Sequence, residues 1–318
     1  MAVYTQVSAE DIALFLEGYD VGTLISAKGI AEGVENSNYL IETTQARFIL
    51  TLYEKRVAAD DLPFFFALLD HLAAQDCPVP PAIVDRNGRA IQRLCNRPAC
   101  LIKYLSGVSV SQATPQQAAS AAAAMAQMHR AVSDFPQQRP NSMGIAQWPI
   151  LLENCGRQLD DIDTGLFDAV SRALRDVVAA WPIMLPHCVI HADLFPDNVL
   201  MLGDRVTGLI DFYFACTDIR AYDLAVMHSA WAFDARGYPL DTAIGKALIN
   251  GYESQMPLSE AERAALPIMA QGACIRFLLS RAWDWLNTPA NALVTRKDPL
   301  AYLRRLNWYR EQGERAFS

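Results

Sequence analysis

The chain has 318 residues, and 52% of them are hydrophobic, which is enough to fill the packed cores of two lobes or domains. Its formal net charge of −8 at pH 7 argues against a general nucleic-acid or anionic-membrane binder, because those partners demand a basic face. The sequence carries neither a secretory signal pattern at its N-terminus nor an apolar stretch as long as a membrane span, so we expect a cytoplasmic protein whose seven cysteines are reduced packing residues.

The first third of the chain predicts a small unit rich in β-structure. Ser8 caps a short helix, and apolar side chains at helical spacing predict an amphipathic helix over residues 60–75. A hairpin turn is expected at residues 85–89. Short strands are predicted over residues 24–30, 39–42, 47–53, 90–94 and 99–104.

A polar turn, residues 33–38, separates the first two predicted strands. Backbone N–H groups in such a turn can bind phosphate groups. It is a poor glycine-rich loop, since it holds only Gly33, with Gly29 before it. An ordinary hairpin turn explains this segment equally well.

From residue 105 onward the sequence changes to helical patterns. Thr114 followed by Pro115 predicts the start of a long alanine-rich helix, in which His129 is better explained as a packed side chain than as a catalytic one. Further helices are expected over residues 148–161, 165–180, 217–225, 228–233, 241–252, 260–287 and 298–315. The predicted fold class is α+β, with a β-rich part over residues 1–104 and a larger helical part over residues 105–318.

The segment between residues 189 and 214 carries the chemistry. Its apolar runs predict short strands, two of which form a hairpin, with Asp193, Asn198 and Asp211 at their ends. These three side chains are therefore expected to meet in one small volume. Such a group suits phosphoryl transfer, in which one carboxylate takes or orients the acceptor proton while an amide oxygen and a second carboxylate hold Mg²⁺. The alternative is a structural hairpin with three surface polar groups, and the order of the motif pieces argues against it.

The motif pieces resemble the aminoglycoside phosphotransferase and choline kinase-like superfamily. His191, Asp193 and Asn198 have the spacing of a kinase catalytic loop, Asp211 lies within Ile-Asp-Phe, and Asp223 opens Asp-Leu-Ala. The loop lacks the Arg that precedes the catalytic Asp of protein kinases, and no Gly follows Asp-Phe. The resemblance implies a protein-kinase-like two-lobe fold in which Asp193 is catalytic and Asn198 and Asp211 bind Mg²⁺. It also implies that His191 braces the loop and that Asp223 is structural.

The same resemblance implies that ATP binds to the N-terminal lobe, residues 1–104, whereas the C-terminal lobe, residues 105–318, carries catalysis and the acceptor. The expected nucleotide contacts are the turn over the phosphates and the lobe connection beside the adenine, which comprise Gly33, Asn36, Ser37, Asn38, Ile102, Lys103, Tyr104 and Leu105.

Two cations typical of related kinases are missing from this sequence. The favoured register places Thr51 where the third strand usually carries a Lys or Arg for the phosphates, and Phe195 stands where protein kinases carry a catalytic-loop Lys. The candidate replacements are Lys28, Lys55, Arg56 or an Arg from the C-terminal lobe. Phosphoryl transfer depends on stabilising negative charge, so the source of this charge is an open question at the level of sequence.

Within the superfamily the chain resembles the homoserine kinase branch nearly end to end, in residues 29–39, 48–54, 191–198 and 276–285. The resemblance implies transfer of the γ-phosphoryl group of ATP to the side-chain hydroxyl of L-homoserine, a step toward threonine. Arg276 and Arg281 are then the expected ligands of the substrate carboxylate, and Asp284 or Glu35 the expected partner of its ammonium group.

Three alternatives stay open. Arg276, Ser280 and Asp284 share one helix face, so they could form an intrahelical salt-bridge ladder with Trp283 and Trp285 in the core. The acceptor could be another small alcohol such as choline, methylthioribose or an aminoglycoside, or the chain could be a non-catalytic, kinase-like nucleotide-binding protein. The expected partners are small molecules, with neither nucleic acid nor membrane, in a monomer or small homo-oligomer.

Overall fold

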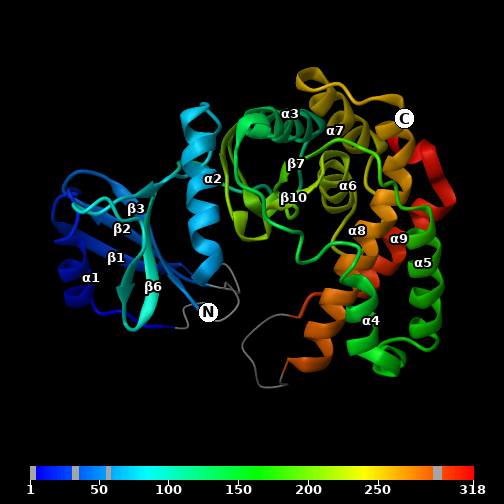
Figure 1. Cartoon of the computed structure of the whole chain (residues 1–318), viewed down its shortest axis with the longest axis horizontal. Helices are drawn as coiled ribbons and strands as arrows, with labels where there is room; N and C mark the ends of the chain where they lie inside the picture. Colours follow the sequence, from blue (N-terminus) through cyan, green and yellow to red (C-terminus); the bar gives the residue numbers. More distant parts are fainter. Residues whose placement is uncertain (1–4, 31–35, 55–58, 289–295) are drawn as a thin grey trace. The chain divides into compact units, whose positions relative to one another are not determined.

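The computed structural model describes residues 5–30, 36–54, 59–288 and 296–318. The chain divides into two compact units, Met1–Ser106 and Gly107–Ser318, whose elements are labelled in Figure 1. This division falls two residues after the predicted boundary at residue 104. No helix in the described part of the chain is long and apolar enough to cross a membrane.

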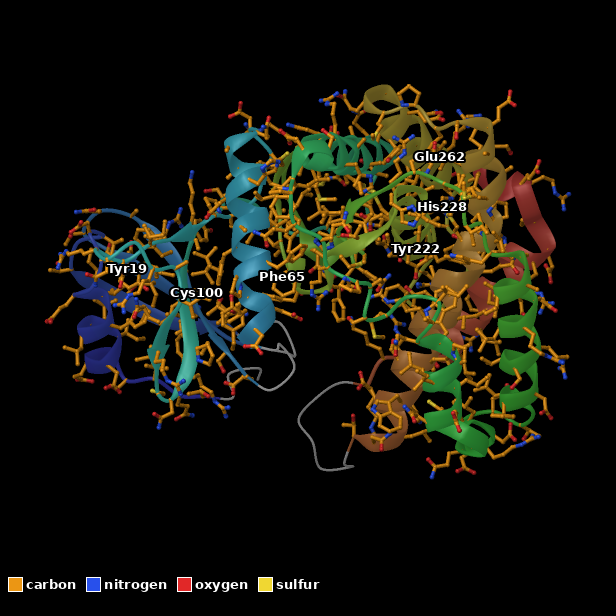
Figure 2. The ribbon with its side chains drawn as sticks, in the orientation of Figure 1. Tyr19, Phe65, Cys100, Tyr222, His228 and Glu262 are labelled. Atoms are coloured by element: carbon orange, nitrogen blue, oxygen red, sulfur yellow. The ribbon has the colours of Figure 1, made fainter. Side chains whose placement is uncertain are left out.

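The first unit is built on an antiparallel sheet with the strand order β1-β2-β3-β6-β4, in which β5 also pairs with β6. Its strands and helices are α1 (Ala9–Leu16), β1 (Leu24–Ile30), β2 (Asn36–Thr43), β3 (Arg47–Tyr53), α2 (Leu62–Ala74), β4 (Ala82–Ile83), β5 (Gln92–Leu94) and β6 (Arg97–Lys103). Strand β3 lies between β2 and β6, which explains why most of its side chains are buried. Tyr19 and Cys100, labelled in Figure 2, are buried in this unit.

The second unit combines helices with two short two-stranded sheets, β7 with β10 and β8 with β9. Its first elements are α3 (Pro115–Ala131), α4 (Trp148–Cys155), α5 (Leu166–Ala180), β7 (His187–Ile190), β8 (Val199–Leu202) and β9 (Arg205–Leu209). They are followed by β10 (Cys216–Ile219), α6 (Arg220–Trp231), α7 (Thr242–Gln255), α8 (Glu260–Asn287) and α9 (Leu300–Gln312). The long helix α8 contacts α4, α5, α6 and α9, so it forms the axis of the unit (Figure 1).

Local sequence explains where the main helices begin and how closely they pack. Thr114 and Gln117 form a capping box at the start of α3, and Ser259 and Glu262 form another at the start of α8. Helices α3 and α7 approach closely because Gly251 has no side chain. A β-carbon at that position would lie 2.2 Å from the carbonyl oxygen of Ala119.

The predicted α+β two-lobe fold is confirmed, and four local expectations are wrong. Residues 217–219 belong to β10 and not to a helix, because they pair with β7. Strand β2 begins at Asn36, so half of the predicted polar turn is sheet. The helix expected over residues 148–161 ends at Cys155 and continues as a 3-10 turn, and Cys95 is an exposed side chain rather than a packed one.

A buried ion pair joins the starts of α6 and α8. Glu262, labelled in Figure 2, is fully buried and accepts hydrogen bonds from the Arg220 guanidinium, with Nη2 at 2.8 Å, and from the Ser259 N–H at 2.9 Å. Burial by itself would raise the pKa of Glu262, but the hydrogen bonds from Arg220 and Ser259 outweigh it and lower that pKa below its ordinary value. The pair therefore stabilises the folded chain in its charged form.

We expect Glu262→Gln to lower the free energy of unfolding by about 2–3 kcal/mol at pH 7, because it leaves the half-buried Arg220 without a charge partner. The pKa of Glu262 in the folded state lies below the unfolded value of ~4.3. The extra free energy of unfolding of the unsubstituted chain should therefore decrease below pH ~4.3 and be lost as the pH falls through the folded-state pKa. Denaturant unfolding at pH 7 and pH 3.5 measures both effects. A gap between the two proteins that is the same at both pH values would contradict this account.

Candidate active site

The catalytic loop follows strand β7 and turns sharply just before Asp193. Ala192 has a φ of 64°, a left-handed conformation that costs a residue with a β-carbon ~1–2 kcal/mol. The loop then passes through a 3-10 turn at Pro196–Asn198 and enters β8. Backbone strain directly before the candidate catalytic carboxylate requires contacts that hold the loop in place.

Asp223 of α6 provides two of these contacts. Its carboxylate accepts hydrogen bonds from the backbone N–H of His191 at 2.8 Å and of Ala192 at 2.7 Å. The buried His129 lies with Nε2 3.0 Å from the same carboxylate and Nδ1 2.9 Å from the Tyr252 hydroxyl. Burial by itself would raise the pKa of Asp223, but the hydrogen bond and charge of His129 bring that pKa below its ordinary value. Asp223 is thus the structural brace, and His129 is a packed histidine.

Three side chains, one from the loop itself and two from helices α6 and α8, bind successive carbonyl groups of the loop. The Arg276 guanidinium of α8 donates from Nη1 to the Ala192 carbonyl. Asn198 Nδ2 donates to the Asp193 carbonyl at 2.8 Å. Trp231 Nε1 of α6 donates to the Leu194 carbonyl at 2.9 Å. The main chain from residue 191 to residue 194 is therefore held on both its N–H and its C=O side.

His191 connects this loop to the segment that carries Asp211. Its Nδ1 accepts the Asp193 N–H at 3.3 Å, which leaves Nε2 to donate to the Ile210 carbonyl at 2.9 Å. Burial lowers the pKa of His191, so the ring is neutral and suited to this pair of roles. The Ile210 N–H in turn donates to the Asn198 carbonyl at 3.0 Å. The structure thus gathers Asp193, Asn198 and the start of the Asp211 segment into one hydrogen-bonded group.

The pKa of Asp193 is set by loss of hydration and by nearby charges of both signs. Loss of hydration raises the pKa of its carboxyl group to about 8, although 19% of the side chain is still accessible to solvent. The Arg276 guanidinium, with Nη2 3.9 Å from Oδ1, opposes this increase, and Lys297 does so too. Asp211 and Asp197 add to the increase. A carboxylate with a raised proton affinity in reach of solvent is suited to accept a proton from a hydroxyl group.

The side chains beside Asp193 also fit a hard cation. Because Asn198 Nδ2 is committed to the Asp193 carbonyl, the amide oxygen Oδ1 is the atom that this side chain can offer to a metal. Asp211 adds carboxylate oxygens from a backbone with a φ of 67°. Carboxylate and amide oxygens are the donors that Mg²⁺ prefers, so this donor set suits the ion.

In the first unit, the predicted phosphate-side residues of β2 are engaged in the sheet. Thr51 is buried, and its hydroxyl donates to Asn38 Oδ1 at 2.8 Å, so this position holds a neutral hydrogen bond and no cation. Ser37 Oγ donates to Glu54 Oε1 at 2.9 Å, and Asn36 Oδ1 accepts the Glu54 N–H. Both side chains are buried. The remaining predicted residues of this region, Gly33, Glu35, Lys55 and Arg56, lie outside the described residues.

The predicted adenine-binding segment is partly engaged as well. Ile102 pairs with Ile49 on one side and Ala82 on the other, and the Lys103 N–H donates to the Pro81 carbonyl. The main chain of Tyr104 and Leu105 comes after this pairing ends. Of the four predicted residues, these two are the better candidates for contacts with a base edge.

The C-terminal part of α8 differs from the salt-bridge ladder with core tryptophans that its sequence allowed. Arg276 is buried against the catalytic loop, so it takes no part in a ladder with Asp284, which is exposed. Trp283 is 40% exposed and is not a core residue. Arg281 lies over the Tyr302 ring at 4.5 Å, donates to the Asp298 carbonyl at 3.3 Å, and interacts electrostatically with Asp193. Arg281 is therefore partly accessible and close enough to Asp193 to interact with its charge.

Sequence reasoning missed Lys297. Its Nζ lies 6.0 Å from the centre of the Phe195 ring, and its charge acts on Asp193. Phe195 occupies the loop position where protein kinases carry a Lys. No sequence signal identifies Lys297, because it comes about a hundred residues after the loop and outside any helix or strand.

Comparison with known proteins places the chain among phosphotransferases. Residues 26–262 match the family model described as "Phosphotransferase enzyme family". The chain is 50% identical over 309 residues to a homoserine kinase of Xanthobacter autotrophicus, covering 97% of this chain and 96% of that protein. It is 51% identical over 314 residues to a homoserine kinase of Zymomonas mobilis, covering 98% of each.

Solved structures of related folds agree. The amicoumacin kinase hAmiN, bound to AMP-PNP, Ca²⁺ and amicoumacin, superposes with a TM-score of 0.70 at 13% identity, over 97% of this chain and 94% of that chain. A microcompartment-associated aminopropanol kinase gives a TM-score of 0.64 at 20% identity, over 97% and 98%. These likenesses support the fold. The family match and the identity to curated homoserine kinases confirm the resemblance read from the sequence, and the chain belongs to the phosphotransferase enzyme family.

Proposed function

We propose that this protein is an ATP-dependent kinase that phosphorylates the side-chain hydroxyl of L-homoserine, giving O-phospho-L-homoserine and ADP. The observation that carries the reaction type is the hydrogen-bonded group of Asp193, Asn198 and the Asp211 segment. The acceptor rests on the 50% and 51% identity to curated homoserine kinases over nearly the whole chain.

In the proposed mechanism Asp193 orients the homoserine hydroxyl and accepts its proton. The hydroxyl oxygen attacks the γ-phosphorus in line, the new O–P bond forms, and the bond from that phosphorus to the bridging oxygen of ADP breaks. The raised pKa of Asp193 makes its deprotonated carboxylate a stronger base, which supports its role as proton acceptor. The braced loop reduces the reorganisation needed to bring the carboxylate to the hydroxyl.

The proposal includes Mg²⁺, held by Asn198 Oδ1 and the Asp211 carboxylate. When bound there, the ion supplies positive charge to the phosphate oxygens. On the nucleotide side we propose main-chain contacts to adenine at Tyr104 and Leu105.

For the acceptor we propose that Arg281 binds the homoserine carboxylate. Its guanidinium is partly accessible, and its charge reaches Asp193. A planar guanidinium matches a carboxylate with two parallel hydrogen bonds. Asp284 is exposed on the same helix, three positions along, and it is our candidate partner for the ammonium group.

The direct test is an ATP-consumption assay with homoserine, choline, methylthioribose and an aminoglycoside as acceptors. We expect turnover with homoserine, identified by detection of O-phosphohomoserine. Asp193→Asn should lower kcat by about 10³-fold or more while leaving the far-UV circular dichroism unchanged, because it removes the proton acceptor. Bound nucleotide without turnover on any acceptor would instead support a non-catalytic binding protein.

Arg281→Met should raise KM for homoserine by about 10–100-fold, the cost of losing a charge-assisted pair. The contribution of the substrate carboxylate is isolated by repeating the kinetics with 3-aminopropan-1-ol, which is homoserine without that group. If Arg281 binds the carboxylate, the substitution should hardly change kcat/KM for 3-aminopropan-1-ol. An equal loss on both acceptors would remove Arg281 from this role.

Lys297→Ala should lower kcat by about tenfold or more if its ammonium group stabilises the transferring phosphoryl group in place of the loop Lys. Lys297→Arg should retain most of the activity, since it keeps the charge. Lys246→Ala, an exposed Lys on α7, is the matched control and should behave as the unsubstituted chain. Equal kcat values for the Lys297→Ala and Lys246→Ala proteins would show that the charge at residue 297 has no catalytic effect.

A further inference from the structure

Arg276 is a charged side chain buried to 1% exposure inside the second unit, where it interacts with the catalytic loop, with Phe214, with Tyr222 of α6 and with Phe277 of its own helix. It donates to the Ala192 carbonyl and lies 3.9 Å from Asp193 Oδ1. The guanidinium carbon also lies 5.3 Å from the centre of the Phe214 ring and 4.5 Å from that of Phe277. Burying a guanidinium is costly unless such partners compensate it.

These contacts leave little room for Arg276 to bind a substrate. One Nη is bonded to a loop carbonyl, the other faces Asp193, and aromatic rings lie close to the guanidinium. A soluble carboxylate would have to displace this packing to reach it. Arg281, which is partly accessible, meets no such barrier.

The same contacts hold the main chain at Ala192, which determines the direction of the Asp193 side chain. The Asp223 carboxylate accepts the N–H of Ala192, and Arg276 donates to the C=O of the same residue. Ala192 has a left-handed backbone and directly precedes Asp193. Phe214 belongs to the 3-10 turn that directly follows Asp211. One guanidinium therefore touches both the loop of the candidate base and the segment of the candidate metal ligand.

We propose that Arg276 is a positioning residue, which sets the direction of the Asp193 carboxylate and joins the catalytic loop to the Asp211 segment. The proposal rests on the function proposed above. It replaces the sequence-based expectation that Arg276 binds the substrate carboxylate. A Lys at this position would keep the charge but not the planar set of donors that reaches the Ala192 carbonyl and Asp193 together.

The test compares Arg276→Met, Arg276→Lys and Arg281→Met for kcat and KM on homoserine and on 3-aminopropan-1-ol. For Arg276→Met we expect kcat to fall by about 100-fold on both acceptors, as for a catalytic group displaced by ~1 Å, with KM for homoserine changed less than about threefold. Arg276→Lys should recover part of that kcat. This variant also keeps the test informative if Arg276→Met does not fold.

Two kinetic results would overturn the proposal. A rise in KM confined to homoserine, as expected for Arg281→Met, would assign Arg276 to the substrate carboxylate. Unchanged kcat in both Arg276 variants would remove any positioning effect.

A second measurement needs no acceptor and separates this proposal from the proposed function. Amide hydrogen exchange of the peptide covering residues 191–198 should be faster in Arg276→Met than in Arg281→Met, with global unfolding monitored in parallel. If the unsubstituted protein phosphorylates no acceptor but this difference is present, the proposed function fails and the hold of Arg276 on the loop stands. Equal exchange in the two variants would contradict that hold.

Discussion

The hold of one buried carboxylate, Asp223, on two consecutive N–H groups is the interaction on which the rest of the site depends. It holds Ala192 in a left-handed conformation that a residue with a β-carbon would otherwise avoid. A charged acceptor makes such hydrogen bonds stronger than a neutral one would. His129 of α3 lowers the pKa of the Asp223 carboxylate and holds it in place. Asp223 of α6, some thirty residues after the loop, therefore fixes the backbone just before Asp193.

Asp223 and Asp193 are two carboxylates in opposite environments. A carboxylate that accepts several hydrogen bonds is a poor base, because those bonds lower its pKa. Asp223 has that environment and acts on the backbone. Asp193 has the opposite environment, in which loss of hydration raises its pKa and nearby cations moderate the increase. The two acids thus differ in proton affinity because their surroundings differ.

The two units differ in the charges that they hold at or near the positions singled out by the sequence. In the first unit Thr51 uses its hydroxyl on Asn38, at a position where related kinases carry a cation. In the second unit, Arg276, Arg281 and Lys297 all act electrostatically on Asp193 or its neighbours. Arg276 and Arg281 come from α8, and Lys297 comes from the segment before α9. Arg276 is buried, Arg281 is partly accessible and Lys297 is exposed. Burial divides them into Arg276, which is enclosed against the loop, and Arg281 and Lys297, which are at least partly accessible.

The sequence by itself determined the α+β class, most helix and strand positions, and which three polar side chains are candidates for the site, because these depend on local periodicity, capping residues and fixed spacing within a short segment. The cap at Thr114 and the apolar run of residues 47–53 are examples. Only the tertiary structure decided that residues 217–219 form a strand, since their partner strand β7 lies about thirty residues earlier. It also decided the roles open to Arg276, Arg281 and Lys297. Helical spacing fixes which side of α8 an Arg occupies, but what that side faces depends on packing against elements some eighty residues away, which no local pattern encodes.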